Sequence, residues 1–400
     1  MLTSVALVKG KDGQDLNQVR KMMSELFNLI GPASQIIPPG SKVLIKPNLT
    51  AEENLWEKGI HTSPIFMQAL IEEIQKANPT EIIIAEGTAI GLDTKKAFAA
   101  NGYEEVARQT GARLLDLYAG EYEEVPTPPG SMLKSISISK AVRQADFFIN
   151  APVLKTHVAS TITVAMKNLK GTTTYAEKKR FHYFGLNKAI AELNAILKPN
   201  LHVVDGLIAM EGDGPLAGTP VGLNLLMAGY DAVAVDTIAA RLMGIEPEEV
   251  PALTFAHTMG YGVGDEKEIR IIGTPITAVT QAFRRAAAPL EIKQPNIYFL
   301  DGQACDFCRN VLRLALERLA SLKIPGGKLP PIEIIIGPEG KISRTSPHLK
   351  LPMGRCQRAH KSFPHYVPGC PPQVFLVVDE FREILDLPRR FGPKKDFILD

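Results

Sequence analysis

Cysteine is absent from the first 304 residues of this 400-residue chain, and the chain has no long run of either apolar or basic residues. Its formal net charge is only +2, which gives no general field to attract nucleic acid or a membrane surface. No uninterrupted apolar stretch approaches the roughly 18–20 residues that are needed to cross a bilayer. The apolar segment at residues 1–8 is too short for the core of a signal peptide. We therefore expect a cytoplasmic protein with neither nucleic acid nor a membrane as a partner.

The composition is that of a folded enzyme, with 45% hydrophobic and 22% charged residues. A chain of 400 residues exceeds the length of one ordinary domain, which is roughly 100–200 residues. The segment at residues 274–295 carries no strong strand signal, so we place a boundary within it. The predicted domains are a large one at residues 1–285 and a smaller one at residues 286–400.

The large domain alternates short β-rich runs with longer helical patterns, which is typical of βαβ units. We predict an α/β fold with a mostly parallel, Rossmann-like sheet flanked by helices. The predicted strands are 4–8, 42–46, 81–85, 113–117, 146–150, 201–205 and one near 223–228. The predicted helices are 15–30, 64–77, 94–110, 186–197 and 231–243. The smaller domain is predicted to be α/β as well, with strands at 296–300, 331–336 and 374–378, a helix at 309–322 and a short helix after residue 379.

The four cysteines all lie in this smaller domain, at Cys305, Cys308, Cys356 and Cys370. In a reducing compartment such clustering favours a metal or redox role over disulfides. Cys305 and Cys308 form a Cys-x-x-Cys pair where a predicted strand passes into a helix, and helix N-termini stabilise thiolates. Cys356 and Cys370 lie in Gly/Pro-rich loops, whose backbone amides are free to donate hydrogen bonds to cluster sulfurs. We predict that these four thiolates bind a metal centre, with a 4Fe-4S cluster as the leading interpretation.

Two other interpretations of the cysteines stay open. Structural zinc is disfavoured because zinc ribbons usually present two close pairs, whereas thirteen residues separate Cys356 from Cys370. A thioredoxin-like dithiol would explain only Cys305 and Cys308. The short C-terminal segments resemble the cluster-binding subunits of respiratory complex I and of nickel-iron hydrogenases, through the Cys-x-x-Cys pair, the Gly-Pro-Glu-Gly turn at 337–340 and the Pro-Gly-Cys-Pro-Pro loop. That resemblance implies a 4Fe-4S centre.

Polar residues follow the predicted strands of the large domain. Lys46 and Asn48 come after one strand, Lys155 and His157 after another, and His61 precedes a predicted helix. In open α/β sheets ligands bind beyond the carboxyl ends of the strands, so these side chains are candidate ligand-binding groups.

A basic run further along the chain adds Lys167, Lys170 and His182 to these candidates. Several cations that converge near strand ends suit an anionic ligand such as phosphate or carboxylate, although a solvated basic loop explains any single lysine equally well. His157 and His182 are the candidate acid–base residues, because an unperturbed imidazole titrates near neutral pH.

A Gly-rich segment with acidic residues follows the strand at 201–205. We list Glu211, Gly212 and Gly214 as candidate substrate-binding residues, since glycines permit close ligand approach. Asp205, Glu211 and Asp213 have the chemistry to hold a hard cation, and a purely structural turn is the alternative. The segment is neither a P-loop nor a dinucleotide fingerprint.

Seven motifs between residues 42 and 244 together resemble the domain-of-unknown-function family numbered 362. They are Lys-Pro-Asn, His-Thr-Ser-Pro, Asn-x-Pro-x-Leu-Lys-x-His, Lys-Asn-Leu-x-Gly, Val-Asp-Gly, Glu-Gly-x-Gly-Pro and Asp-x-Val-Ala-Val-Asp. Members of that family are often fused to iron-sulfur modules, which agrees with the interpretation of the cysteines, but the family implies no established reaction.

The leading hypothesis is an iron-sulfur oxidoreductase or electron-transfer protein that acts on an anionic small-molecule ligand, with a redox protein and a second copy of the chain as candidate partners. The alternatives are a non-redox transferase or lyase with a structural metal centre, and a cluster-carrying assembly protein without catalysis.

Overall fold

The computed structural model describes residues 2–286, 294–322, 324, 328–342 and 345–390, and the chain divides into two compact units. The large unit comprises Met1–Lys178 and Asn187–Ala286, and the C-terminal unit comprises Lys179–Leu186 and Ala287–Asp400. The sequence assigned residues 179–186 to the large domain, but they belong with the cysteine-bearing tail. The reason is backbone pairing: the Cys370 N–H donates to the His182 carbonyl at 2.5 Å, and the Leu186 N–H donates to the Cys370 carbonyl at 2.9 Å.

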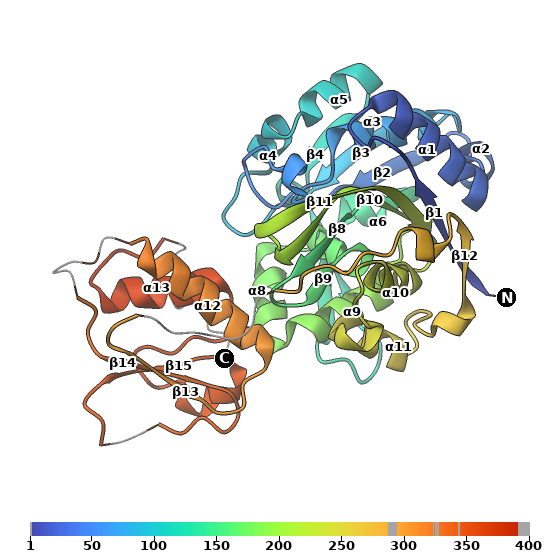
Figure 1. Ribbon diagram of the computed structural model, residues 1–400. Coiled ribbons are helices and arrows are strands. Elements are labelled where there is room, and N and C mark those ends of the chain that lie inside the picture. Colours follow the sequence, from blue (N-terminus) through green and yellow to red (C-terminus); the bar gives the residue numbers. More distant parts are fainter. Residues whose placement is uncertain (1, 287–293, 323, 325–327, 343–344, 391–400) are drawn as a thin grey trace. The chain divides into compact units, whose positions relative to one another are not determined.

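A ten-stranded sheet runs through the large unit (Figure 1). Its strands are β1 Thr3–Lys9, β2 Lys42–Lys46, β3 Glu81–Glu86, β4 Arg113–Asp116, β7 Phe147–Asn150, β8 Val153–His157, β9 Thr161–Thr163, β10 Leu201–Asp213, β11 Ala217–Gly229 and β12 Ile269–Gly273. The order is β12-β1-β11-β10-β7-β2-β3-β4, with β8 beside β10 and β9 beside β8. All pairs are parallel except those of β11 with β1 and β10, and that of β8 with β9. The predicted mostly parallel α/β sheet is confirmed.

Helices cover both faces of this sheet. They are α1 Leu16–Ile30, α2 Ala33–Ile36, α3 Pro64–Gln75, α4 Thr94–Ala100, α5 Tyr103–Thr110, α6 Lys140–Arg143, α7 Ala165–Asn168, α8 Tyr175–Phe184, α9 Leu186–Ile196, α10 Ala232–Leu242 and α11 Pro251–Thr258. Figure 1 shows α1, α3 and α5 over one face and α9 and α10 over the other. The core under α1 and α3 includes Phe27 and Phe66, both fully buried against β-branched strand residues. A separate hairpin is formed by β5 Tyr122–Pro126 and β6 Ser135–Ser139.

Two predicted elements of the large unit differ in extent. The predicted helix at 94–110 is broken into α4 and α5, because Gly102 takes a left-handed conformation with φ of 76°. The predicted strands at 201–205 and near 223–228 extend into the antiparallel hairpin of β10 and β11, and the Gly-rich segment is the end of β10 rather than an open loop.

The C-terminal unit has its own small parallel sheet, with strands β13 Ile297–Asp301, β14 Ile332–Ile336 and β15 Leu349–Pro352 in that order. Helices α12 Asp306–Ala320 and α13 Val374–Ile384 pack on it, and Leu312 and Phe381 are fully buried between them and the strands. The predicted strand at 374–378 is wrong, since these residues begin α13. The run is rich in β-branched residues, but Val377 and Phe381 lie one helical turn apart and enter the same core, so packing overrides the local propensity.

In the part of the chain that the structure describes, no helix combines the length and the apolar character that crossing a bilayer requires.

The buried aromatic residues give a test of this packing. We expect Phe66→Ala to lower the free energy of unfolding by about 3–5 kcal/mol, because truncation of a fully buried phenyl ring leaves a cavity. Phe255, which is 40% exposed on α11, is the matched control, and its replacement by alanine should cost less than about 1 kcal/mol. Equal losses for the two variants in urea unfolding would contradict the placement of the core.

Candidate functional site

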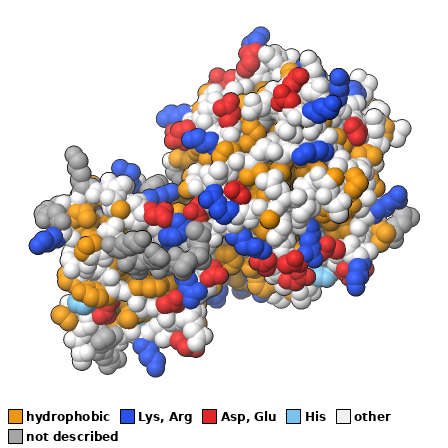
Figure 2. Space-filling model, viewed as in Figure 1, with side chains coloured by type: hydrophobic (Ala, Val, Ile, Leu, Met, Phe, Trp, Pro, Cys, Tyr) orange, Lys and Arg blue, Asp and Glu red, His pale blue; other side chains and the backbone are white. Residues whose placement is uncertain are grey.

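Lysine side chains gather inside the large unit, at the ends of its central strands and in the segment that follows β9. The set, called the lysine cluster below, is Lys46, Lys155, Lys167, Lys170 and Lys178. On the face that Figure 2 displays, basic and acidic side chains are interspersed over the large unit. Within the lysine cluster they are not balanced: among the ion pairs of the described residues, Glu86 is the one carboxylate that pairs with a cluster lysine.

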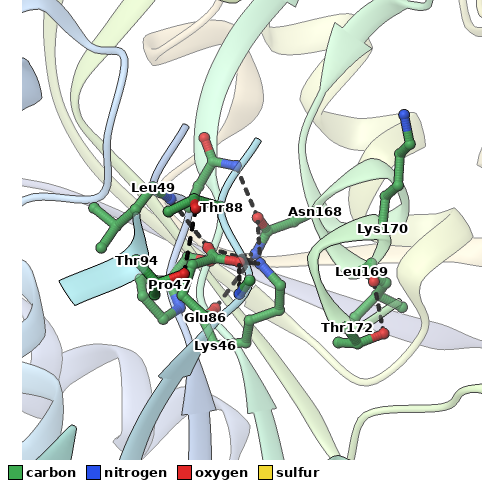
Figure 3. A network of polar contacts seen from close by, with 12 residues as sticks. Lys46, Pro47, Leu49, Glu86, Thr88, Thr94, Asn168, Leu169, Lys170 and Thr172 are labelled. Carbon is green, nitrogen blue, oxygen red and sulfur yellow. Dashed lines mark hydrogen bonds and ion pairs between the residues drawn. The ribbon is translucent and has the colours of Figure 1, made fainter. Parts of the chain in front are cut away.

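Lys46 is fully bonded. It ends β2, is 1% exposed, and its Nζ lies 2.8 Å from Glu86 Oε1 at the end of the neighbouring strand β3. The same Nζ donates to the Pro47 carbonyl at 2.9 Å and to Asn168 Oδ1 at 3.2 Å (Figure 3). Three acceptors satisfy the three N–H groups of an ammonium, so Lys46 has no donor left for a ligand.

The segment after α7 packs directly on this ion pair. It forms the 3₁₀ turn η3 Leu169–Thr172. A Cβ atom at Gly171 would come within 2.3 Å of Glu86 Oε1 and 2.4 Å of Lys46 Cε, so only glycine fits there. The N-terminus of α7 is fixed from the other side by Asp236, whose carboxylate accepts the backbone N–H groups of Ala165 at 2.6 Å and Met166 at 3.1 Å. The position of α7 and η3, and with it that of Lys167 and Lys170, is therefore tightly constrained.

Asparagines connect these elements to the next lysine. Asn168 donates to Asn150 Oδ1 at 2.8 Å and accepts from Asn48 Nδ2 at 2.9 Å. Asn48 Oδ1 in turn accepts from Lys155 Nζ on β8 at 2.7 Å, and the Ile60 carbonyl accepts from the same ammonium at 2.7 Å. Lys155 is fully buried with two acceptors, both neutral, which leaves one N–H without a partner among the described residues.

The remaining lysines fall into two kinds. Lys178 on α8 is buried and donates to the carbonyls of Gly87 and Thr88, each at 2.7 Å, and to the Tyr118 hydroxyl. Lys167 and Lys170 are only partly buried, and neither ammonium has a hydrogen bond or an ion pair within the described ranges. Figure 3 shows Lys170 extending away from the Lys46–Glu86 network. The free donors of the cluster therefore belong to Lys155, Lys167 and Lys170.

Burial acts on the protonation of these amines. It lowers the pKa of Lys167 to about 7 and that of Lys178 to about 7, in the second case against the attraction of Glu86. Burial also lowers the pKa of Lys155 and of Lys170 well below the ordinary lysine value, and the charge of Lys167 lowers both further. Without a ligand, the amines of the site are therefore harder to protonate than those of exposed lysines.

His61, a predicted ligand-binding residue, has both ring nitrogens engaged. Its Nδ1 lies 2.8 Å from Asn101 Oδ1 and its Nε2 accepts the Ala51 N–H at 3.1 Å. Burial lowers its pKa to about 3, so the ring is neutral at physiological pH, with its proton on Nδ1. The ring holds the loop that follows Asn48 in place.

The two predicted acid–base histidines do not lie in one unit. His157 ends β8 in the large unit, is 8% exposed, and accepts the Ala159 N–H on Nδ1 at 2.9 Å. His182 belongs to the C-terminal unit, where its Nδ1 lies 3.3 Å from the Pro371 carbonyl, next to Cys370. The sequence grouped them because an unperturbed imidazole titrates near neutral pH, but α8, which carries His182, spans the division between the units.

The predicted Gly-rich site lies in the β10–β11 hairpin. Glu211 Oε2 accepts the Arg284 N–H at 2.8 Å, and Gly212 donates its N–H to the Arg284 carbonyl at 2.7 Å. A Cβ atom at Gly214 would come within 2.0 Å of the Thr156 carbonyl, so this glycine permits the hairpin to pack on β8. Asp205, at the other end of the segment, accepts the Ser63 N–H at 2.7 Å. Each of these residues makes structural contacts.

The four cysteines are free thiols in the C-terminal unit. Cys305 is the N-cap residue of α12, and Cys308 lies in its first turn. The loops that carry the other two cysteines are bonded to each other: the Gly354 N–H donates to the Val367 carbonyl and the Arg355 N–H to the Gly369 carbonyl, both at 2.8 Å. A Cβ atom at Gly354 would lie 3.6 Å from Cys308 Sγ, so the loop of Cys356 passes beside α12.

The thiols act on one another electrostatically. A hydrogen bond from the Cys308 thiol, together with the backbone N–H groups of Cys308 and Phe307, lowers the pKa of Cys305 to about 6. The pKa of Cys308 is raised because its thiol donates to Cys305, because it is buried, and because Cys370 and Cys356 lie near it. As the side chains stand, no three His, Cys, Asp or Glu residues of the described chain are gathered closely enough to hold a metal ion.

Comparison with known proteins places the lysine cluster within a recognised family segment. Residues 43–241 match the family described as Domain of unknown function (DUF362). The resemblance expected from the seven motifs is thereby confirmed for this segment, which contains the whole lysine cluster and none of the cysteines. A thylakoid-associated protein from Synechocystis sp. is 25% identical over 268 residues, which cover 65% of this chain and 80% of the relative.

Two solved structures match this chain at low similarity. The lactate racemase apoprotein from Thermoanaerobacterium thermosaccharolyticum has a TM-score of 0.39 at 13% identity, covering 83% of this chain and 68% of that one. A structural genomics target from Thermotoga maritima has a TM-score of 0.41 at 12% identity, covering 93% of this chain and 84% of that one. With both TM-scores below 0.5, neither protein bears on the function of this one.

The predicted site omitted several residues that shape the cluster. Glu86 follows the predicted strand at 81–85, and Asn168 lies within the basic run. Their positions marked them as candidates but did not indicate a role. Tyr118, which follows β4, carried only the signal of its position after a parallel strand, and Asn101 carried none.

The buried ion pair gives a first prediction for the site. We expect Glu86→Gln to cost about 3–5 kcal/mol of unfolding free energy, since it leaves the Lys46 ammonium buried without a counter-charge. Glu105→Gln, which breaks an exposed pair with Arg108, is the control and should cost less than about 1 kcal/mol. If Glu86→Gln unfolds in urea at the same midpoint as the control, the pair does not hold the site together.

Lys167 gives a second prediction, in which the effect of a substitution on stability depends on pH. Its pKa is depressed in the folded chain, so stability increases as the pH rises from about 7 toward the unfolded value near 10.4. Lys167→Met removes the buried charge, and we expect it to raise the melting temperature at pH 6 by roughly 2–4 °C, which is about 1 kcal/mol. The gain should disappear at pH 10, where the wild-type amine is already neutral. A variant less stable than wild type at pH 6, measured by calorimetry without added anions, would show that Lys167 is compensated.

Proposed function

We propose that this chain is an iron-sulfur protein, an oxidoreductase or electron-transfer protein, that binds an anionic small molecule at the lysine cluster. The observation that carries the ligand class is that Lys155, Lys167 and Lys170 have no carboxylate partner among the described residues. A buried or half-buried cation without a counter-charge is costly in free energy, and a bound anion offsets that cost. The DUF362 match agrees with this placement, because all three lysines lie within residues 43–241.

The cofactor proposal is supported by the chemistry of the C-terminal unit. Thiolates are the ligands that iron-sulfur clusters prefer, and the four cysteines are borne by α12 and by two loops that are hydrogen-bonded to each other. Gly354 and Gly369, with φ of 91° and 128°, permit those loops to turn tightly beside Cys308. Cys305, Cys308, Cys356 and Cys370 are the residues that would hold the group. A bound 4Fe-4S cluster would supply one-electron transfer.

Anaerobic purification tests the cofactor. We expect about four iron atoms and four sulfides per chain, with an EPR signal after reduction, and we expect Cys356→Ser to retain less than about half of the iron. Lys361→Ala is the control, since it alters an exposed residue at the end of the 3₁₀ turn that carries Cys356 without removing a thiolate or an imidazole, and it should keep the iron. A folded wild-type chain without iron, or a Cys356→Ser chain with full iron content, would contradict the proposal.

A second candidate function, a non-redox transferase or lyase with a structural metal centre, is favoured by one observation. The amine of Lys167, with a pKa of about 7, is suited to act as a general base or nucleophile at neutral pH. Zinc in place of iron, measured by elemental analysis of the same preparation, would favour this candidate. A cluster whose spectrum changes on addition of a substrate would exclude it.

We also propose that the protein acts in the cytoplasm with a redox partner protein. The thylakoid association that is printed for the Synechocystis relative concerns that protein. Fractionation of cells that express the tagged chain separates the two locations, and recovery with membranes would contradict the cytoplasmic proposal.

A further inference from the structure

The lysine cluster has a charge and a donor geometry that discriminate between kinds of anion. Its free donors are carried by three elements: Lys155 by β8, Lys167 by α7, and Lys170 by η3, three residues further on. The charge of Lys167 acts on both Lys155 and Lys170, so its amine lies near each of them. Lys155 is tied through Asn48 to Asn168, the residue that follows Lys167, so the three amines are held by one bonded framework. That framework is rigid, because Gly171 of η3 packs directly against the Lys46–Glu86 pair.

The count of charges sets the charge of the ligand. Glu86 compensates Lys46, and the N–H groups of Lys178 are taken up by two carbonyls and a hydroxyl. Lys155, Lys167 and Lys170 are therefore the three ammonium groups whose donors are free for a ligand. A monocarboxylate supplies one negative charge and two acceptor oxygens, and would leave two of the three cations without a partner. A dianion with three free oxygens offers one acceptor to each of these amines and neutralises two of their three charges.

The type of residue indicates which dianion. The free donors are all lysine amines, which lack the planar pair of N–H groups with which arginine holds a carboxylate or a phosphate. Lysine acts as a compact point charge with three donors and binds the tetrahedral oxygens of a phosphate without a planar requirement. Resting on the proposed function at the same site, we propose that Lys155, Lys167 and Lys170 bind the phosphate group of a small phosphate ester.

Calorimetric titration of the full-length chain tests this with defined probes. Inorganic phosphate and glycerol 3-phosphate should bind at pH 7.5, with at least about tenfold lower affinity for acetate at equal ionic strength. Lys167→Gln and Lys170→Gln should each weaken phosphate binding about tenfold or more, whereas Lys21→Gln, an exposed lysine on α1, should bind as wild type. Near-UV circular dichroism establishes that each variant is folded.

The outcomes separate this inference from the proposed function. Tighter binding of glycerol 3-phosphate than of inorganic phosphate supports a phosphate ester, and the reverse order overturns the ester in favour of free phosphate. Equal affinity for acetate overturns the preference for phosphate but leaves an anion site. Unchanged phosphate binding in both lysine variants overturns these lysines as the phosphate site and places the anion elsewhere in the protein. Absence of binding by every anion overturns the anionic ligand of the proposed function too, while the iron content of the same preparation still decides the cofactor.

Discussion

The ion pair of Lys46 with Glu86 is the interaction on which the site of the large unit depends. A lysine that is 1% exposed must have a counter-charge and a full set of acceptors. Glu86 on β3 supplies the counter-charge, and the Pro47 carbonyl and Asn168 supply the other acceptors. That requirement draws α7 and η3 onto the ends of two parallel strands. Because Gly171 packs on the pair, the backbone between Lys170 and α8 has little freedom to move. The internal ion pair therefore helps to fix the positions of Lys167 and Lys170.

The lysines of the cluster divide by role once their acceptors are known. Lys46 and Lys178 are saturated and stabilise the architecture, whereas Lys155, Lys167 and Lys170 keep donors free. Concentrating like charges in this way lowers the stability of the chain without a ligand, since burial depresses the pKa values of these amines. Functional sites commonly carry such a cost in stability. The cysteines form a second, chemically different group in the C-terminal unit, where the Cys308 thiol and then backbone amides lower the pKa of Cys305 at the start of α12.

Much of the fold was predictable because its signals are local. The apolar runs of β2 and β3 and the amphipathic pattern of α1 indicate their own structure, and a parallel sheet brings their ends together. Non-local choices were not predictable: the strand-like run at 374–378 became helical through packing of Phe381, and residues 179–186 joined the tail through backbone pairing with Cys370. In the site, the sequence identified Lys46, Lys155, Lys167 and Lys170 but not their different roles. Those roles depend on partners such as Glu86 and Asn168, which lie 40 and 122 residues from Lys46.

The central claim is that the large unit holds lysines whose charge is uncompensated until an anion binds. The most direct measurement is an NMR pH titration of the chain with ¹³Cε-labelled lysine, with and without phosphate. We expect lysine signals that titrate near pH 7 in the anion-free protein. One of them should disappear in Lys167→Met, and the others should titrate at higher pH when phosphate is present. If every lysine titrates above about pH 10 without an anion, the charges are already compensated and the account is wrong.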